Sequence, residues 1–182
     1  PFAMSMVSLI KRMVPEQEGA VNSSISEKYT DPIANAKALK SISYLLGSEI
    51  TGICKIPEYA WYSNRKDGSE IPYKHKYAVV MLIDQGYETM EGASGDDFIS
   101  GAQSMRAYMR GAEIAGIMAE HLRANGFPSR PQTNADSDVI HTSLVMWAGL
   151  GELSRIGEVV LNPFIGPRLK TVVMTTDMPL EV

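Results

Sequence analysis

The sequence predicts one globular domain of mixed helices and strands, of the α/β or α+β class. Three observations lead to this prediction. The chain of 182 residues is 45% hydrophobic and 21% charged, which is the composition of a compact protein with a sizeable core. Segments with helical periodicity alternate along the chain with short apolar runs that are typical of strands. No internal repeat or low-complexity tract interrupts this order, so a fold of packed layers follows.

The N-terminal third of the chain divides at Asp31. Residues 1–30 show no sustained period and contain several serines, so we interpret them as an N-terminal arm or linker and residues 31–182 as the core domain. From Asp31 the apolar residues recur at helical spacing, with Pro32 at a favourable first position and Gly47 closing the run. An amphipathic helix is expected there.

Four further segments are expected to be strands. EITGICKI (49–56) and YAVVMLID (77–84), which is apolar up to its final Asp, flank a polar loop, and the second of them reads as a buried strand. Nearer the C-terminus, EVVLN (158–162) and LKTVVMTTDM (169–178) are rich in β-branched residues and are joined through PFIGPR.

Two more helices are expected in the second half of the chain. Residues 98–125 form the longest helical pattern, and it ends at Asn125 and Gly126, a pair that suits a left-handed cap. Residues 138–147 form a shorter pattern of the same kind.

Composition narrows the classes of partner and metal. A net charge of −4 and an isoelectric point near 5.4 argue against a nucleic-acid-binding surface, which would concentrate Lys and Arg. Cys54 is the one cysteine, so this chain alone cannot assemble a disulfide, a Cys-rich zinc site or an iron–sulfur cluster. The chain has no apolar run of about eighteen residues and no recognisable signal peptide, so we expect a cytoplasmic protein without a membrane segment.

The glycine-rich stretch AGLGELSRIG begins like a dinucleotide-binding fingerprint but does not complete it. Gly149 and Gly151 fit the start of that motif, the third glycine is missing, and the stretch follows a helix rather than a strand. From the pattern alone, the plainer interpretation is a helix that ends at Gly149 in a left-handed turn.

The histidines and Ser104 match no standard site. The spacing of His75, His121 and His141 fits no metal-binding motif, so we interpret them as surface or hydrogen-bonded groups and predict no metal ligand. Ser104 lacks the G-x-S-x-G turn of a hydrolase nucleophile, so a serine triad is not expected.

Tyr108 and Lys170 are less ordinary, and the pattern leaves two interpretations of each. Small residues follow Tyr108 on one side of the long helix, where they allow either a flat bulky ligand or a neighbouring sheet to approach. Lys170 lies in a predicted strand, where alternation places it either inward with Val172 and Met174 or outward at an edge.

A longer run of motifs resembles the reductive dehalogenases, a family of cobalamin and iron–sulfur enzymes. The stretch AGLGELSRIGEVVLNPFIGPRLKTVVMTTDMPLEV is similar to the family run that contains A-G-L-G-x-x-S-R-x-G, a Gly-Pro turn and a T-x-M/L-P-L ending. Upstream, the order of Ser104, Tyr108, the Asn125–Gly126 helix end, Pro131 and Asn134 also fits the family. The resemblance covers about residues 33–182.

The resemblance implies a fold, an activity and a set of catalytic residues. The fold would be a nitroreductase-like, cobalamin-binding core with a central, mainly antiparallel sheet flanked by helices. The activity would be reductive dehalogenation of an organohalide, a halogenated aromatic or phenol, by a base-off cobalamin. Tyr108 corresponds to the proton donor and Lys170 to the basic residue that supports it, whereas Ser104 and Asn134 correspond to residues near the substrate pocket.

The same resemblance implies where the cofactor binds and what the intact protein contains. The expected cofactor-binding residues lie in the glycine-rich stretch and the turn after it: Gly149, Gly151, Ser154, Arg155, Gly157, Gly166 and Arg168. The two arginines either contact the cofactor or cap helix carbonyls. A Cys-rich segment with two 4Fe-4S clusters is expected after Val182 in the intact parent, together with an electron donor such as a ferredoxin or a reductase domain.

Three alternatives remain open at this point. A cobalamin-binding or processing protein would keep the fold without needing Tyr108 and Lys170 to converge. An enzyme like the epoxyqueuosine reductases would share a related glycine region but use an acidic proton donor where this chain has Tyr108. A flavin-dependent reductase of nitroreductase-like architecture would bind a different cofactor in a similar cleft.

Overall fold

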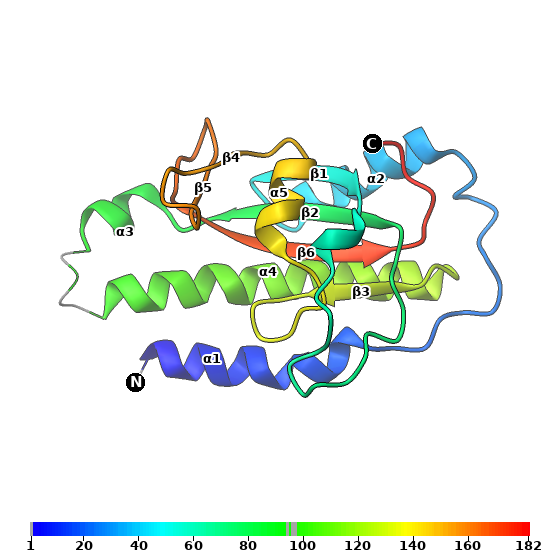
Figure 1. Cartoon of the computed structure of the whole chain (residues 1–182), viewed down its shortest axis with the longest axis horizontal. Coiled ribbons are helices and arrows are strands. Elements are labelled where there is room, and N and C mark those ends of the chain that lie inside the picture. Colours follow the sequence, from blue (N-terminus) through cyan, green and yellow to red (C-terminus); the bar gives the residue numbers. More distant parts are fainter. Residues whose placement is uncertain (1, 94, 96–97) are drawn as a thin grey trace.

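The computed structural model describes residues 2–93, 95 and 98–182, and a four-stranded antiparallel sheet forms its centre (Figure 1). The strands lie in the order β1-β2-β6-β3, and every neighbouring pair is antiparallel. Their bounds are Ile50–Lys55 for β1, Tyr77–Asp84 for β2, Leu169–Thr176 for β6 and Ser129–Gln132 for β3. This confirms the predicted central antiparallel sheet with flanking helices.

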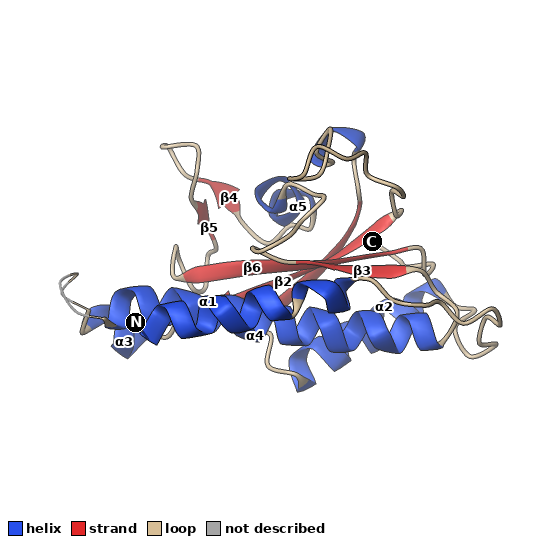
Figure 2. Ribbon diagram, turned by 90° about the horizontal axis from the view of Figure 1, so that it is seen from below, coloured by secondary structure: helices blue, strands red, loops and turns tan. Residues whose placement is uncertain are grey.

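The two faces of the sheet are covered by different elements, as Figure 2 shows. On one face lie α2 (Pro32–Leu45) and α4 (Ile99–Ala124), with α1 (Phe2–Arg12) packed along α4. The other face carries α5 (His141–Trp147) and the hairpin of β4 (Glu152–Leu153) and β5 (Val160–Leu161). The remaining short helices are η1 (Val14–Gln17), η2 (Glu58–Ala60) and α3 (Tyr87–Glu91).

Alternation along β2 divides the core into two layers. Val79, Met81 and Ile83 belong to the cluster that packs on α2 and α4, whereas their sequence neighbours face the α5 side. Because successive side chains of a strand point to opposite faces, a strand covered on both faces must be apolar throughout. The segment 77–84, apolar up to Asp84, therefore is the buried strand that the sequence predicts.

The N-terminal segment differs from its interpretation as an irregular arm, because residues 2–12 form α1. Phe2, Met6 and Ile10 are spaced by four residues and so form one stripe along the helix. This stripe is too short to be recognised in the sequence as a sustained period. Ile10 is buried, and α1 packs against α4. Tertiary packing on the long helix therefore stabilises a helix that local pattern alone did not reveal.

The other predicted elements occur close to their expected places, with two differences. The helix expected over 138–147 begins only at His141, because residues 133–140 form a loop whose polar groups pair with other segments. The strand expected over 158–162 shortens to Val160–Leu161, which pairs with β4 rather than joining the central sheet.

Strand β3 was not predicted, because its sequence SRPQ contains a proline and has no apolar alternation. Proline cannot donate to a strand ladder, but it is tolerated where one side of the strand has no partner strand. β3 is such an edge strand, paired only with β6.

The close approach of α4 to β6 depends on Gly111. A Cβ added at Gly111 would lie 3.0 Å from Cβ of Val172, whereas a Cβ added at Gly116 on the same helix would meet no heavy atom within 4 Å in the described part of the chain apart from the adjacent helix backbone and chain neighbours. We expect Gly111→Leu to lower the free energy of unfolding by about 1–3 kcal/mol through overpacking. Gly116→Ala, the matched control, should raise it by about 1 kcal/mol because alanine favours helix. Urea unfolding followed by circular dichroism measures both, and an unchanged midpoint for Gly111→Leu would contradict this packing.

Candidate active site at the open edge of strand β6

The candidate site lies where β6 extends past its neighbour β3. β3 pairs only with residues 173–176 of β6, and after Gln132 the chain turns away in a loop. Residues 169–172 therefore pair with β2 on one side and leave the other edge without a partner strand. Tyr108, on α4 beneath this edge, lines the space that results.

Two cavities meet at this edge. The first, of about 550 Å³, lies between residues 62–66, residues 133–142 and Tyr108, and we call it the loop cavity. The second, of about 310 Å³, lies between the residues leading into β5, the start of β6 and Tyr108, and we call it the hairpin cavity. Tyr108, Thr142 and Thr171 line both. A ligand in either cavity would therefore meet the same phenol.

The structure brings Tyr108 and Lys170 together. The Nζ atom of Lys170 lies 5.1 Å from the centroid of the Tyr108 ring, a cation–π distance. Lys170 lies on the α4 side of β6 with Val172 and Met174, both of which belong to that core layer, so the inward alternative holds. Both Tyr108 and Lys170 are half-buried, which keeps them accessible from the cavities.

His141 is a neutral wall of the loop cavity. Its Nε2 lies 3.1 Å from the hydroxyl of Ser137, and its Nδ1 lies 3.3 Å from that of Thr171. Burial lowers the pKa of His141 from 6.5 to about 4, because a charged imidazolium would lose its hydration there. At neutral pH, His141 therefore contributes hydrogen-bonding capacity and no charge.

The two predicted pocket residues occupy different places. Asn134 lines the loop cavity together with Tyr108. Ser104 lies one turn before Tyr108 on α4, accepts a hydrogen bond of 2.9 Å from Nε2 of Gln85, and is not among the residues that line the two cavities. The structure thus brings Asn134 to the candidate site and places Ser104 beside it.

The predicted cofactor-binding glycines fall into two kinds. Gly149, Gly157 and Gly166 have positive φ angles, and among the described residues beyond their chain neighbours no heavy atom lies within 4 Å of a Cβ added to any of them. Gly151 is different, because a Cβ there would lie 2.6 Å from the carbonyl oxygen of Leu161 across the β4–β5 hairpin. Gly151 therefore allows the hairpin to close, whereas the other three leave open backbone that a large ligand can approach.

The polar residues among the predicted cofactor contacts also differ. The hydroxyl of Ser154 is buried and has no hydrogen-bond partner among the described residues, which fits a hydrogen bond to a ligand. Arg155 is exposed. Arg168 forms an ion pair of 2.7 Å with Asp84, and this hydrogen bond lowers the pKa of the Asp84 carboxyl. Arg168 also lies over the ring of Tyr87, so its guanidinium group already has two partners within this chain.

Apolar side chains on the same side of the molecule lack cover. Ile156 is 75% exposed and Phe164 is 83% exposed, and both belong to the glycine-containing hairpin and turn. The open glycine backbone and the buried hydroxyl without a partner together fit a large ligand with amide groups, such as cobalamin.

The histidines pair with hydroxyl groups. Nδ1 of His75 lies 2.9 Å from the hydroxyl of Thr175, and Nε2 of His121 lies 3.0 Å from that of Tyr29. Within residues 2–93, 95 and 98–182, no group of three or more His, Cys, Asp or Glu side chains is arranged to hold a metal ion. None of the helices in this part of the chain combines the length and apolar character needed to cross a bilayer.

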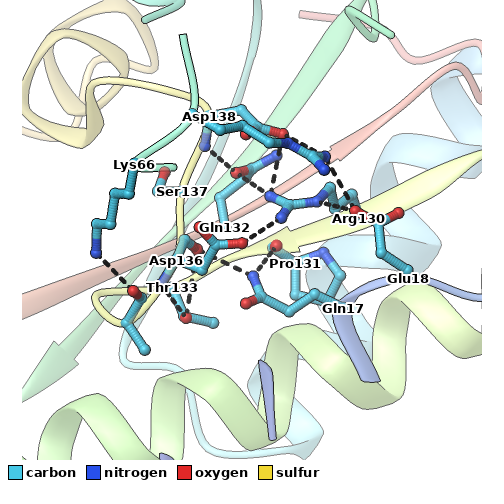
Figure 3. A network of polar contacts seen from close by, with 12 residues as sticks. Gln17, Glu18, Lys66, Arg130, Pro131, Gln132, Thr133, Asp136, Ser137 and Asp138 are labelled. Atoms are coloured by element: carbon cyan, nitrogen blue, oxygen red, sulfur yellow. Dashed lines mark hydrogen bonds and ion pairs between the residues drawn. The ribbon is translucent and has the colours of Figure 1, made fainter. Parts of the chain in front are cut away.

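A buried ionic network, which no sequence pattern indicates, holds the loop that carries Asn134 (Figure 3). Asp138, whose side chain is 2% exposed, pairs with Arg130 and with Arg65 at 3.2 and 3.1 Å. Arg130 also pairs with Asp136 and Glu18. These groups come from four separate segments and have no shared motif, so no single-sequence signal would have found them.

The N-terminal arm completes this network. The side-chain amide of Gln17 donates to the carbonyl oxygens of Pro131 and Asp136, at 2.5 and 3.0 Å. Gln132 accepts from Arg130 and from the backbone N–H of Asp138. The loop after β3 is thereby fixed from both sides, which holds the wall of the loop cavity in place.

The fold and the site together define a class of enzyme core. A central antiparallel sheet with helices on both faces, and a Tyr108–Lys170 pair beside an open glycine-rich turn, are the features that the resemblance to the reductive dehalogenases implies.

Solved structures of that family match the chain over nearly its whole length. The catabolic reductive dehalogenase NpRdhA, N-terminally tagged, is 53% identical with a TM-score of 0.92, over 99% of this chain and 27% of that one. The same enzyme in complex with 3-bromo-4-hydroxybenzoic acid matches with the same identity and TM-score, over 99% of this chain and 26% of that one. A third structure, 53% identical with a TM-score of 0.92 over 99% of this chain and 27% of that one, is described as a reductive dehalogenase that suggests a mechanism for B12-dependent dehalogenation.

The chain belongs to the reductive dehalogenase family. It spans 27% of the length of the first of these solved chains, so it corresponds to one part of such an enzyme. No family model matches the chain, and no curated protein matches it.

Burial of His141 predicts a dependence of stability on pH. The folded protein holds the His141 pKa near 4 and the ordinary value is 6.5, so between these limits the unfolded chain binds the proton more tightly. The part of the free energy of unfolding that depends on a neutral His141 is fully present above pH 6.5 and is lost as the pH falls toward 4. Between pH 6.5 and 4, the free energy of unfolding of His141→Gln should therefore fall by up to about 3 kcal/mol less than that of the unchanged protein. Urea unfolding across this pH range measures it, and an identical slope in the variant would show that His141 is not responsible.

Proposed function

We propose that this chain is the part of a B12-dependent reductive dehalogenase that carries the proton donor and much of the cofactor-facing surface. The observation that carries the proposal is the contact between Lys170 and Tyr108 at the junction of the two cavities. A packing role alone would not require a lysine on the α4 side of the sheet, because even partial burial of a charged side chain is unfavourable unless it has a partner or a function.

The substrate class we propose is a halogenated phenol or a related haloaromatic acid. A family member of known structure binds 3-bromo-4-hydroxybenzoic acid. The loop cavity, at about 550 Å³, has room for an aromatic ring with substituents, and its lining mixes tyrosine and aliphatic side chains with hydroxyl and amide groups. Such a lining suits a planar ring that carries polar substituents.

In this proposal, Tyr108 is the proton donor to the carbon that loses the halide. A phenol can act as a general acid when it lies at the reacting atom and when the resulting phenolate is stabilised. The ammonium of Lys170, on the face of the Tyr108 ring, stabilises that phenolate by opposite charge. Tyr108 and Lys170 therefore work as one unit, and Asn134 and the neutral His141 help to position the ring of the substrate.

We further propose that cobalamin binds in its base-off form against the glycine-rich turns. Gly149, Gly157 and Gly166 would allow its edge to approach the backbone, and the hydroxyl of Ser154 would donate to one of its amide oxygens. Cobalamin would supply the redox chemistry that no side chain of this chain can provide. The two iron–sulfur clusters and the electron donor expected in the intact enzyme remain predictions about that enzyme.

Substitutions at Tyr108 and Lys170 test the proposal in the intact, cobalamin-loaded enzyme. Tyr108→Phe and Lys170→Met should each lower the rate of dehalogenation by roughly 10²–10⁴, the range for loss of a positioned acid, without loss of cobalamin. The double variant should be little worse than either single one, because residues that act as a unit are not additive. Halide release and bound cobalamin, read from the visible spectrum, are the measurements.

Tyr44→Phe on the exposed face of α2 is the matched control and should leave the rate unchanged. Retained turnover in Tyr108→Phe with full cofactor loading would eliminate Tyr108 as the proton donor. A visible spectrum of flavin rather than cobalamin after reconstitution would favour the flavin-dependent alternative, and bound cobalamin without any halide release would favour a carrier.

A further inference from the structure

The loop cavity has an unbalanced charge. Of the described residues that line it, Lys66 is the one with a full charge, because none is Asp or Glu and burial keeps His141 neutral. Tyr108, which also lines this cavity, belongs to a different element. A cavity whose one formal charge is positive favours an anionic ligand over a neutral or cationic one.

The backbone around Lys66 is fixed by its neighbour Arg65. Arg65 points into the buried network, where it pairs with Asp138 and Glu18 at 3.1 and 3.0 Å. The turn after it is closed by backbone hydrogen bonds between Arg65 and both Gly68 and Ser69. The two adjacent basic residues therefore have different roles: Arg65 anchors the loop in an ionic network, and Lys66 is left to face the cavity.

The ammonium group of Lys66 is oriented but not neutralised. Its Nζ donates to the carbonyl oxygen of Ala135 at 2.5 Å, which joins the loop of residues 62–66 to the loop after β3 (Figure 3). A lysine ammonium has three donors, so two remain available. Lys66 takes part in no ion pair among the described residues, whereas Arg65 and Arg130 each have two or more carboxylate partners.

We propose that Lys66 binds the carboxylate of an anionic aromatic substrate and thereby selects haloaromatic acids over uncharged halophenols. This inference rests on the proposed function, since it assigns one end of the loop cavity to the acid group and leaves the halogenated end of the ring to Tyr108. The bond to Ala135 holds the ammonium in place before the substrate arrives, which lowers the entropic cost of binding.

A purely structural role for Lys66 makes a different prediction. If Lys66 served only to join the two loops through Ala135, its loss would loosen the cavity for every substrate to the same extent. If Lys66 binds the carboxylate, its loss weakens the binding of only those substrates that carry a carboxylate. The comparison of two matched substrates therefore separates the two roles.

The test uses 3-bromo-4-hydroxybenzoic acid and 2-bromophenol, which differ only in the carboxylate. In the intact, cobalamin-loaded enzyme, Lys66→Met should lower kcat/KM for the acid by about five- to tenfold, between the effect of an exposed ion pair and that of a charged hydrogen bond. The value for 2-bromophenol should change by less than about twofold. Lys66→Arg should restore most of the preference, and added salt should reduce it.

Lys76→Met is the matched control, because Lys76 is exposed near the end of the same polar segment and does not line the cavity. Calorimetric titration of the protein with 3-bromo-4-hydroxybenzoic acid provides a readout that needs no turnover, and Lys66→Met should raise its Kd by the same factor. Equal losses for both substrates, or an unchanged Kd, would overturn the role of Lys66 while leaving dehalogenation intact. Absence of halide release from either substrate, with a Kd that still depends on Lys66, would instead overturn the proposed function alone.

Discussion

The candidate site depends on one constraint, which is that strand β3 is shorter than strand β6. β3 covers residues 173–176 of β6 and then leaves the sheet, so residues 169–172 keep an open edge. A longer β3 would close the space that the loop cavity occupies, and Tyr108 would be an ordinary core residue. The open edge lets Tyr108 line both cavities, and Lys170, which lies over the Tyr108 ring, lines the hairpin cavity.

Leaving a strand edge open carries a risk, since unpaired strand edges attract other strands. Here the loop of residues 133–140 lies across the loop cavity from this edge, and a network of buried charges holds that loop in place. The carboxylate of Asp138 pairs with two arginines, so the cost of burying this charge is offset by two guanidinium groups, and the backbone N–H of Asp138 donates to the side-chain oxygen of Gln132. The same network ends at Glu18 and Gln17, which ties the N-terminal arm to the wall of the site.

The sequence predicted the parts of the molecule that depend on local periodicity. The apolar run of β2 and the long helix that carries Tyr108 follow from patterning, whereas the meeting of Tyr108 with Lys170 was implied only by the resemblance to the family. Helix α1 and strand β3 could not be predicted, because each is stabilised by packing on a distant element. The role of Lys66 was equally hidden, since it follows from where Arg65 and Ala135 lie and not from any motif.

We propose above that Tyr108 and Lys170 lie at the reacting end of a substrate held in the loop cavity. The most direct measurement is a crystal structure of the intact, cobalamin-loaded enzyme with a halogenated phenol bound. We expect the aromatic ring to lie in the loop cavity with its halogen-bearing carbon nearest to the Tyr108 hydroxyl, and Lys170 to remain beside the Tyr108 ring. A ligand bound away from Tyr108, or a cofactor that does not contact the turns at Gly149, Gly157 and Gly166, would contradict it.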